Sequence, residues 1–292
     1  MTTFRDAVRQ KDFSVTAELF LRPESNAETI AAQTELLRDH VDGILLTDNQ
    51  GGRLHLSPVA AAGVVLASGS DPIVQLSTRN RNRVALFAEL LGAAAIGVSS
   101  VQLVRGRAVP DGFDPRPKAV LDVDVVELLE MASRIKQEDN LVHLPELFLG
   151  SVLTVHRPKP DWTPRKLLAK ADAGAQFVLS SLCMNTDVVR GFLRPLVAAG
   201  VPRRLNVFIT LAVLGSADDA RFLREIRRSH TIPEALIERL DAAADPEAEG
   251  IAIAAEQLRT LADIPGVRGA HLVATRRLAS ISAAIEAAGL TR

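Results

Sequence analysis

Glu18 is the residue of this sequence best placed for proton chemistry. It lies in the stretch FSVTAELFLRP, residues 13–23, where apolar and polar residues alternate with the period of two that is typical of a β-strand. Pro23 stops this strand, so we expect Glu18 near its carboxyl end among apolar side chains. Burial raises the pKa of a carboxyl and lets it hold a proton at neutral pH, as a general acid must. A salt bridge from Glu18 to a nearby arginine on the rim is the structural alternative.

Other polar and charged residues follow strand-like runs in the same way. They are Thr47, Asp48, Asn49, Gln75, Arg105, Arg107, His156, Ser180, Ser181, Thr210 and His271. Each also has a structural interpretation. Asp48 and Asn49 could form a turn, a serine could cap a helix, and a histidine is more often structural than catalytic. Cys183 has no evident base beside it and is more simply a small apolar filler.

Composition narrows the class of protein. The chain has 292 residues, 47% of them hydrophobic, and a net charge of -1, which argues against nucleic-acid or anionic-membrane binding. No apolar run reaches membrane-spanning length, and the first residues lack the apolar core of a signal peptide. One cysteine excludes an intrachain disulfide, and six scattered histidines form no metal motif. We therefore expect a cytoplasmic protein; its oligomeric state, including a homo-oligomer, stays open.

Strand-like and helix-like runs alternate along the whole chain. The strand-like runs are near Phe13–Glu18, Gly43–Thr47, Ile73–Thr78, Ser100–Val104, Gly150–Val155, Gln176–Ser181, Asn206–Leu211 and Gly269–Val273. The helix-like runs are near Ala27–His40, Ser57–Ser68, Asn80–Ala95, Val123–Glu138, Thr163–Ala173, Asp187–Ala199, Asp218–Ser229 and Arg276–Ala287. Eight such units predict an α/β protein, a single (β/α)8 TIM barrel over residues 1–292. A doubly wound open sheet is the alternative, but no GxGxxG follows any strand.

Two helix-like segments and one long loop depart from the regular alternation of strands and helices. Pro233–Asp241 and Pro246–Ala262 are amphipathic, begin with proline, and predict extra helices after the seventh strand without a separate domain. The segment Arg105–Asp122 is rich in glycine and proline and follows the fourth strand. It should therefore be a long loop on the face where barrel active sites lie.

Several blocks of the sequence resemble the methylenetetrahydrofolate reductase family over about residues 13–288. The blocks are AELFLRP (17–23) for the family's FEFFPP, QLSTRNRN (75–82) for HLTCRDRN, LVRGR (103–107) for LRGD, ADAGA (171–175) for VDAGA, and the closing section from IPEAL (232–236) to IPGVRGAH (264–271). The resemblance implies an eightfold βα barrel that reduces 5,10-methylenetetrahydrofolate to 5-methyltetrahydrofolate, usually through FAD. It also implies that Glu18 is the proton donor.

The sequence departs from the family at positions that surround the flavin. The acid of LRGD is Arg107, the histidine of HLTC is Gln75, and the glutamine of a TQ pair that contacts the pterin is Ser181. The residues that would approach the FAD phosphates and ribose are Thr163, Lys166, Ala169 and Lys170, of which only the last lysine matches. Thr47 and His156 match flavin-side positions. The loss of most contacts makes FAD doubtful.

We therefore expect a reductase that takes hydride directly from NADH or NADPH. Carboxylate and amide groups at Asp48, Asn49 and Gln75 could bind the donor edge of the pterin, and Arg105 or Arg107 could bind a phosphate or the glutamate tail. The expected sites are, for the substrate, Asp48, Asn49, Gln75, Ser181 and Thr210, and for the cofactor, Thr47, Arg105, Arg107, His156 and Lys170. The alternatives are an FAD-dependent reductase and a folate-binding paralogue without turnover.

Overall fold

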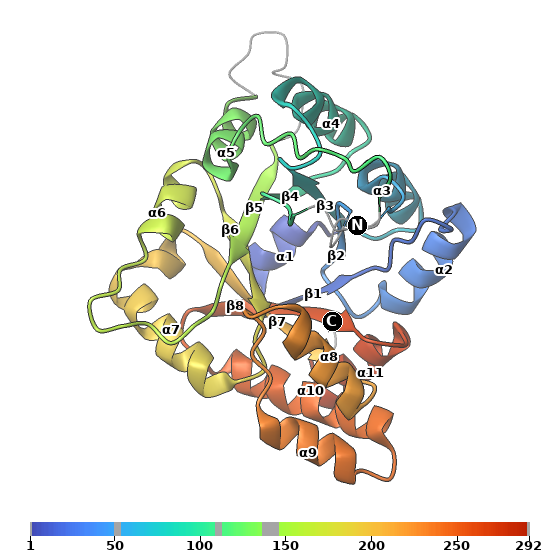
Figure 1. The fold of residues 1–292 in the computed structure, drawn as a ribbon, viewed down its shortest axis with the longest axis vertical. Helices are drawn as coiled ribbons and strands as arrows, with labels where there is room; N and C mark the ends of the chain where they lie inside the picture. Colours follow the sequence, from blue (N-terminus) through green and yellow to red (C-terminus); the bar gives the residue numbers. More distant parts are fainter. Residues whose placement is uncertain (1, 50–53, 109–112, 136–145, 291–292) are drawn as a thin grey trace.

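Eight parallel strands close into one barrel, in sequence order from β1 to β8 (Figure 1). The computed structural model describes residues 2–49, 54–108, 113–135 and 146–290. The strands are β1 Ser14–Glu18, β2 Gly43–Leu46, β3 Pro72–Ser77, β4 Ser100–Val104, β5 Phe148–Leu153, β6 Phe177–Leu182, β7 Asn206–Val213 and β8 Val267–Ala274. The predicted TIM barrel is confirmed, and each strand lies within a few residues of its expected position.

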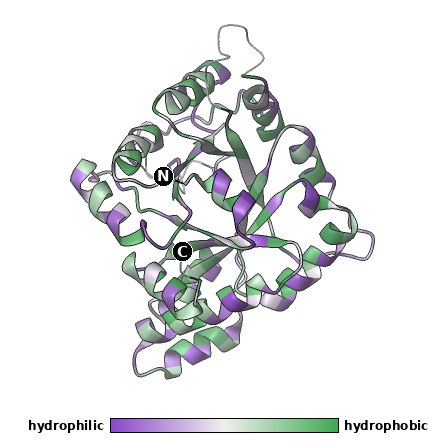
Figure 2. Cartoon of the chain, turned by 180° about the vertical axis from the view of Figure 1, so that it is seen from behind, coloured by the Kyte–Doolittle hydropathy of each residue, from purple (hydrophilic) through white to green (hydrophobic). Residues whose placement is uncertain are grey.

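Helices surround the barrel, with hydrophilic residues on their outer faces (Figure 2). They are α1 Phe4–Gln10, α2 Ala27–Leu37, α3 Pro58–Ala67, α4 Arg83–Ala95, α5 Val125–Arg134, α6 Arg165–Asp172, α7 Thr186–Ala198, the 3-10 helix η4 Val201–Arg203, α8 Ala217–Ile226, α9 Glu234–Ala242, α10 Pro246–Ala262 and α11 Ala279–Ala288. Asparagine, serine or aspartate side chains cap many of them: Asn26 accepts from Thr29 N before α2, and Asn82 accepts from Ala85 N before α4. These caps explain why the helices begin directly after polar strand-end loops.

The extra helices after the seventh strand are present, but the helix that packs on the barrel is a different one from the helix that we expected. We expected Asp218–Ser229 to be the outer helix and the next two helices to be additions. In the structure α10 packs against both β7 and β8, while α8 and α9 pack on each other before it. The outer position therefore belongs to α10, and the additions are α8 and α9. The long apolar face of α10, with six buried residues, explains why it covers the barrel.

A short N-terminal helix, which sequence patterns did not predict, closes the amino end of the barrel. Figure 1 shows α1 inside the ring of strands. Its Phe4 is fully buried and lies 5.3 Å from the rings of both Phe177 and Phe208 and 5.6 Å from that of Phe148. Edge-on aromatic packing of this kind adds to the burial of apolar area. This end of the barrel is a packed core, so a substrate can enter only from the other end.

Asp71 fastens α1 to the barrel. Its Oδ2 accepts from Phe4 N at 2.7 Å, and Ser99 Oγ donates to the same carboxylate. Burial raises the pKa of Asp71 to about 6, against the opposing effect of these two hydrogen bonds. The buried carboxyl therefore prefers its protonated form more strongly in the folded chain than in the unfolded chain.

We predict that Asp71 makes the protein less stable as the pH rises from 4 to 7. The stabilisation is complete below the unfolded pKa of 3.8 and is lost as the pH passes the folded value near 6, a change of about 3 kcal/mol. Asp71→Asn keeps an acceptor for Phe4 N but cannot ionise. Urea unfolding of both proteins at several pH values should show this difference growing with pH in favour of the variant. Asp12→Asn, at an exposed position, is the control; a pH-independent difference for Asp71→Asn would contradict the assignment.

Candidate active site

The open end of the barrel brings most of the predicted site residues together. Glu18 is the last residue of β1 and is 7% exposed. Neighbouring β2 places Leu45 opposite Glu18 and continues into Thr47 and Asp48, both of which are buried. Parallel strands present their carboxyl ends at one face, where barrel enzymes carry their chemistry. The predicted burial of Glu18 at a strand end is thus confirmed; its proton-donor role stays a prediction.

Asp48 is held by an ion pair. Its Oδ2 accepts from Arg81 Nη1 at 2.7 Å and from Ser77 N at 2.8 Å, and its side chain is 0% exposed. The other oxygen, Oδ1, is buried and has no partner within the described part of the chain. Asp48 therefore has a structural role through one oxygen, in an ion pair and a bond to β3 rather than in the turn that was the alternative. The second oxygen is available to a ligand.

Two glutamine side chains link four neighbouring strands, from the end of β2 to β5. Gln75 Oε1 accepts from Asp48 N at 3.2 Å, and Gln75 Nε2 donates to Gln102 Oε1 at 2.7 Å. Gln102 Nε2 in turn donates to Ser151 O at 3.4 Å. This network fixes the orientation of the Gln75 amide. A pterin bound beside it would have to fit that orientation. Gln102 was not predicted, because a single polar residue in an apolar strand carries no motif.

Arg79 joins three loops of the open end. Its guanidinium donates to the carbonyl oxygens of Asn49 and Arg107, both at 3.1 Å, and burial lowers its pKa. Asn49 adopts a left-handed backbone conformation with φ 47°, and its Oδ1 accepts from Asn80 Nδ2. The arginine of the QLSTRNRN block thus positions the loops after β2 and β4.

The loop after β4 leaves two arginines at the open end. Arg105 is exposed, and its carbonyl accepts from Arg79 N at 3.0 Å. Arg107 is also exposed, and its Nη2 donates to Ile226 O, the last residue of α8, at 3.0 Å. The end of the loop returns to β3, where Leu121 N donates to Thr78 O at 3.0 Å. The expected position of this loop on the catalytic face is confirmed for its two described ends; residues 109–112 lie outside the described part of the chain.

On the far side of the opening, β6 and β7 meet at an irregularity. The register shifts between Leu179 and Leu182, so that both serines of this segment face one stretch of β7. Ser180 Oγ accepts from Thr210 N at 2.8 Å, and Thr210 Oγ1 donates to Ser180 O at 2.6 Å. Ser181 Oγ is buried without a partner in the described residues. Two of the predicted substrate contacts lie here. The Thr210 hydroxyl already donates to Ser180 O, whereas the Ser181 hydroxyl is available to a ligand.

A buried histidine lies beside this bulge. His271 on β8 is paired in register with Thr16 of β1 and Thr210 of β7. Its Nδ1 lies 3.0 Å from Thr16 Oγ1, and complete burial lowers its pKa to about 3. The imidazole is therefore neutral at physiological pH and cannot supply a positive charge to a substrate. This agrees with the structural interpretation of His271.

His156 and Lys170 belong to a separate region around α6. His156 packs edge-on against Trp162 and Phe192, each with ring centres 5.1 Å away. Lys170 Nζ donates to Val152 O at 2.5 Å, and burial together with the charge of Lys166 lowers its pKa to about 8. In the described part of the chain, neither residue bonds to the site residues named above.

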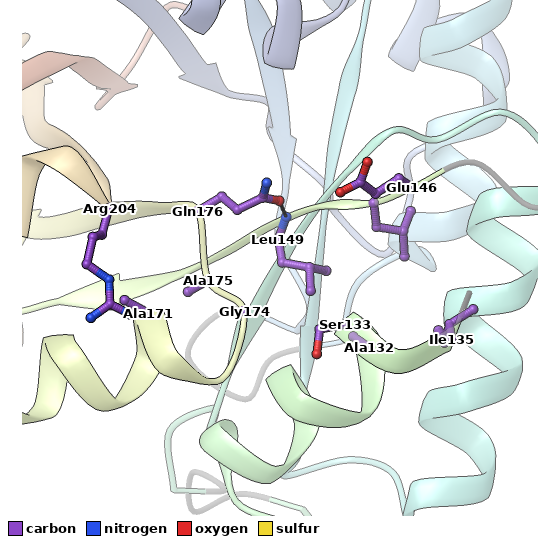
Figure 3. Close-up of a pocket in the computed structure, with 11 residues that line it drawn as sticks. Ala132, Ser133, Ile135, Glu146, Leu149, Ala171, Gly174, Ala175, Gln176 and Arg204 are labelled. Atoms are coloured by element: carbon purple, nitrogen blue, oxygen red, sulfur yellow. Dashed lines mark hydrogen bonds between the residues drawn. The ribbon is translucent and has the colours of Figure 1, made fainter. Parts of the chain in front are cut away.

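A large cavity lies away from this site. It has a volume of about 450 Å³ and lies between α5 and α6, near the starts of β5 and β6 (Figure 3). Its wall includes Leu149, whose N donates to Gln176 Oε1 at 3.2 Å. The cavity is at the amino end of these strands, so it cannot serve chemistry at Glu18. We find no cluster of three metal-ligating side chains and no helix able to cross a membrane in the segments described.

Comparison with known proteins identifies the family. The sequence model for methylenetetrahydrofolate reductase matches residues 3–289. This chain belongs to the methylenetetrahydrofolate reductase family. The resemblance seen in the sequence blocks is therefore confirmed over almost the whole chain. No curated protein matches at a significant level.

Solved structures share the reductase-family fold at low sequence identity. An uncharacterised protein from Clostridium thermocellum, which binds two copies of 5-methyl-5,6,7,8-tetrahydrofolic acid, matches with a TM-score of 0.64 and 14% identity. The alignment covers 97% of this chain and 96% of that chain. A 2,3-dimethylmalate lyase of the PEP mutase/isocitrate lyase superfamily matches with a TM-score of 0.50, 13% identity and coverage of 93% and 81%. At these identities the likeness shows the fold alone.

Proposed function

We propose that this chain reduces 5,10-methylenetetrahydrofolate to 5-methyltetrahydrofolate with hydride taken directly from NADH or NADPH. The observation that carries the proposal is Glu18, a buried carboxyl at the open end of a barrel of this family. The folate-binding Clostridium thermocellum protein shares the fold and supports a folate substrate. Asp48, Asn49, Gln75, Ser181 and Thr210 remain the proposed substrate contacts.

Glu18 has a defined task in this reaction. The five-membered ring of the substrate opens to a cationic iminium at N5 when N10 receives a proton, and the hydride then adds to the methylene carbon. A buried carboxylic acid at the strand end can supply the proton to N10. Asp48 Oδ1 and Ser181 Oγ, both lacking a partner among the described residues, can orient the pterin by accepting from its donor edge or donating to its carbonyl. The chain contributes mainly orientation, since the hydride comes from the nicotinamide.

The side chains around α6 do not fit an FAD. A flavin pyrophosphate needs cationic or N–H donors, but Lys170 donates to Val152 O and has its pKa lowered to about 8. His156 packs edge-on against Trp162 and Phe192. Thr47 and Arg105 stay as proposed nicotinamide-side positions. The proposed hydride transfer therefore needs no flavin.

We predict that the purified protein is colourless and that added FAD does not raise its activity. With both substrates bound together, initial rates should follow sequential kinetics, because hydride passes between them in one complex. Absorbance spectra of gently purified protein and double-reciprocal plots with NADH and methylenetetrahydrofolate test this. One equivalent of flavin absorbance, or parallel lines, would restore the FAD-dependent alternative.

A folate-binding paralogue without turnover is the second candidate. The Clostridium thermocellum protein, described by the folate that it binds, favours it, and so does Arg107 in place of the family's acid. A binder would have no need of a buried acid at Glu18. Tight binding of 5-methyltetrahydrofolate together with no oxidation of NADH or NADPH by methylenetetrahydrofolate would support the binder and contradict the reductase.

A further inference from the structure

Two arginines from distant parts of the chain meet over the open end of the barrel. Arg107 follows β4, and its Nη2 donates to Ile226 O at 3.0 Å across a sequence separation of 119 residues. Arg227 is the next residue after Ile226 and caps α8. This contact places the Arg107 guanidinium against the backbone directly before Arg227, although the two residues follow different strands. No motif in the sequence predicts the pairing, because it depends on where α8 lies.

The segment after α8 is fixed above the end of β6. Thr231 N donates to Leu182 O at 3.0 Å, Met184 N donates to Thr231 O at 2.8 Å, and His230 Nδ1 donates to Leu223 O at 2.7 Å. Arg227 is half-buried at the start of this segment. It is therefore held at the opening rather than extended into solvent.

The pKa values of Arg227 and His230 are shifted by neighbouring charged groups. Burial lowers the pKa of Arg227, the charge of Arg107 lowers it further, and Glu18 acts in the opposite direction. Burial and the same two arginines also lower the pKa of His230, which favours a neutral imidazole. Arg107 and Arg227 thus lie within the electrostatic reach of each other, and Arg227 within that of Glu18.

Among the described residues, the positive charge of this pair is offset only by the electrostatic influence of Glu18 on Arg227. Within the described ranges, neither Arg107 nor Arg227 lies within ion-pair distance of a carboxylate, whereas Arg81 pairs with Asp48 and Arg83 with Asp122. Two neighbouring cations repel each other, and partial burial increases the cost. A bound anion would remove both penalties.

We propose that Arg107 and Arg227 bind the pyrophosphate of the nicotinamide dinucleotide. This inference rests on the proposed reductase function. The guanidinium group is a planar fork that matches phosphate oxygens in pairs, and two adjacent forks match two adjacent phosphates. The carboxylates of a folate glutamate tail share this anionic chemistry, but a flexible side chain separates them. Lys170, the other cation expected near phosphate, lies around α6 and donates to Val152 O, away from Arg107 and Arg227.

Equilibrium binding tests the proposal with four probes: NADH, NADPH, and 5-methyltetrahydrofolate with one or with several glutamates. Arg227→Gln and Arg107→Gln should each raise the Kd for the bound dinucleotide about 10- to 100-fold and leave both folate Kd values unchanged. The matched control is Arg228→Gln, at the exposed neighbouring position, which should change none of them. Arg227→Lys keeps the charge and should recover part of the affinity.

The outcomes separate this inference from the function on which it rests. Weaker binding of the folates, with dinucleotide binding unchanged, would assign the pair to the glutamate tail and overturn the proposal. Unchanged binding of all probes in both folded variants would overturn it as well. If the unaltered protein binds neither NADH nor NADPH, the reductase function itself fails. Thermal melts establish that each variant is folded.

Discussion

Glu18→Gln is expected to lower kcat for methylenetetrahydrofolate reduction by about 10² to 10⁴. Glutamine has the size of glutamate and keeps a donor and an acceptor, so the barrel and the substrate contacts should survive. It cannot transfer a proton, so N10 would leave without protonation and the reactive iminium would form slowly. KM for the folate should change little, because the lost interaction belongs to the transition state.

The control for Glu18 is Glu28→Gln, at an exposed position at the start of α2. It removes one carboxylate from the same unit of the chain without approaching the barrel opening. Initial rates with saturating NADH and a thermal melt should show a large loss of turnover only for Glu18→Gln. Near-normal turnover in that variant would place the acid elsewhere and remove the main support for the proposed mechanism.

Asp48→Ala is expected to lower the free energy of unfolding by about 3 to 5 kcal/mol. The substitution leaves Arg81 without the carboxylate 2.7 Å from its Nη1 and leaves Ser77 N without its acceptor. Arg81 keeps its second carboxylate, Glu89, whose Oε1 lies 3.3 Å from its Nε. The carboxylate that is lost is the fully buried one, and Ser77 N is left without an acceptor in a buried place, where an unpaired group costs most. Weaker folate binding should accompany the loss of stability if Oδ1 meets the pterin.

A double substitution separates the ion pair from other effects of the alanine. In Asp48→Ala/Arg81→Met the buried charge has been removed as well, so part of the lost stability should return. Asp39→Ala, which removes a mostly exposed carboxylate, should change the unfolding free energy by less than about 0.5 kcal/mol. Urea unfolding measures all three. Equal destabilisation in the single and the double variant would mean that the pair with Arg81 contributes little.

The sequence predicted the barrel because its evidence is local. Alternating strands, turn residues and capping residues mark β1 to β8 without any knowledge of packing. The plug formed by α1 was missed because seven residues are too few to show a helical period, and its stability comes from Phe4 among distant aromatic rings. The exchange between α8 and α10 was missed for a related reason, since only tertiary contacts decide which amphipathic helix covers the sheet.

The sequence predicted where the site residues lie, but not which of them contact one another. Residues at strand ends, such as Glu18 and Asp48, follow from the topology of a parallel barrel. The ion pair of Asp48 with Arg81 and the contact of Arg107 with α8 join segments far apart in the chain, so no spacing rule could reveal them. His156 and Lys170 were expected beside a cofactor, which stays a prediction; the structure adds a local partner for each on its own βα unit.

Transfer of an isotope tests the central claim of direct hydride transfer. NADH carrying deuterium at the transferred position of C4 is incubated with the purified protein and methylenetetrahydrofolate, and the methyl group of the product is analysed by mass spectrometry. Direct transfer predicts one deuterium in each methyl group formed, because no exchangeable carrier intervenes. A methyl group that contains hydrogen from solvent would reveal an exchanging intermediate such as a reduced flavin, and would contradict the account.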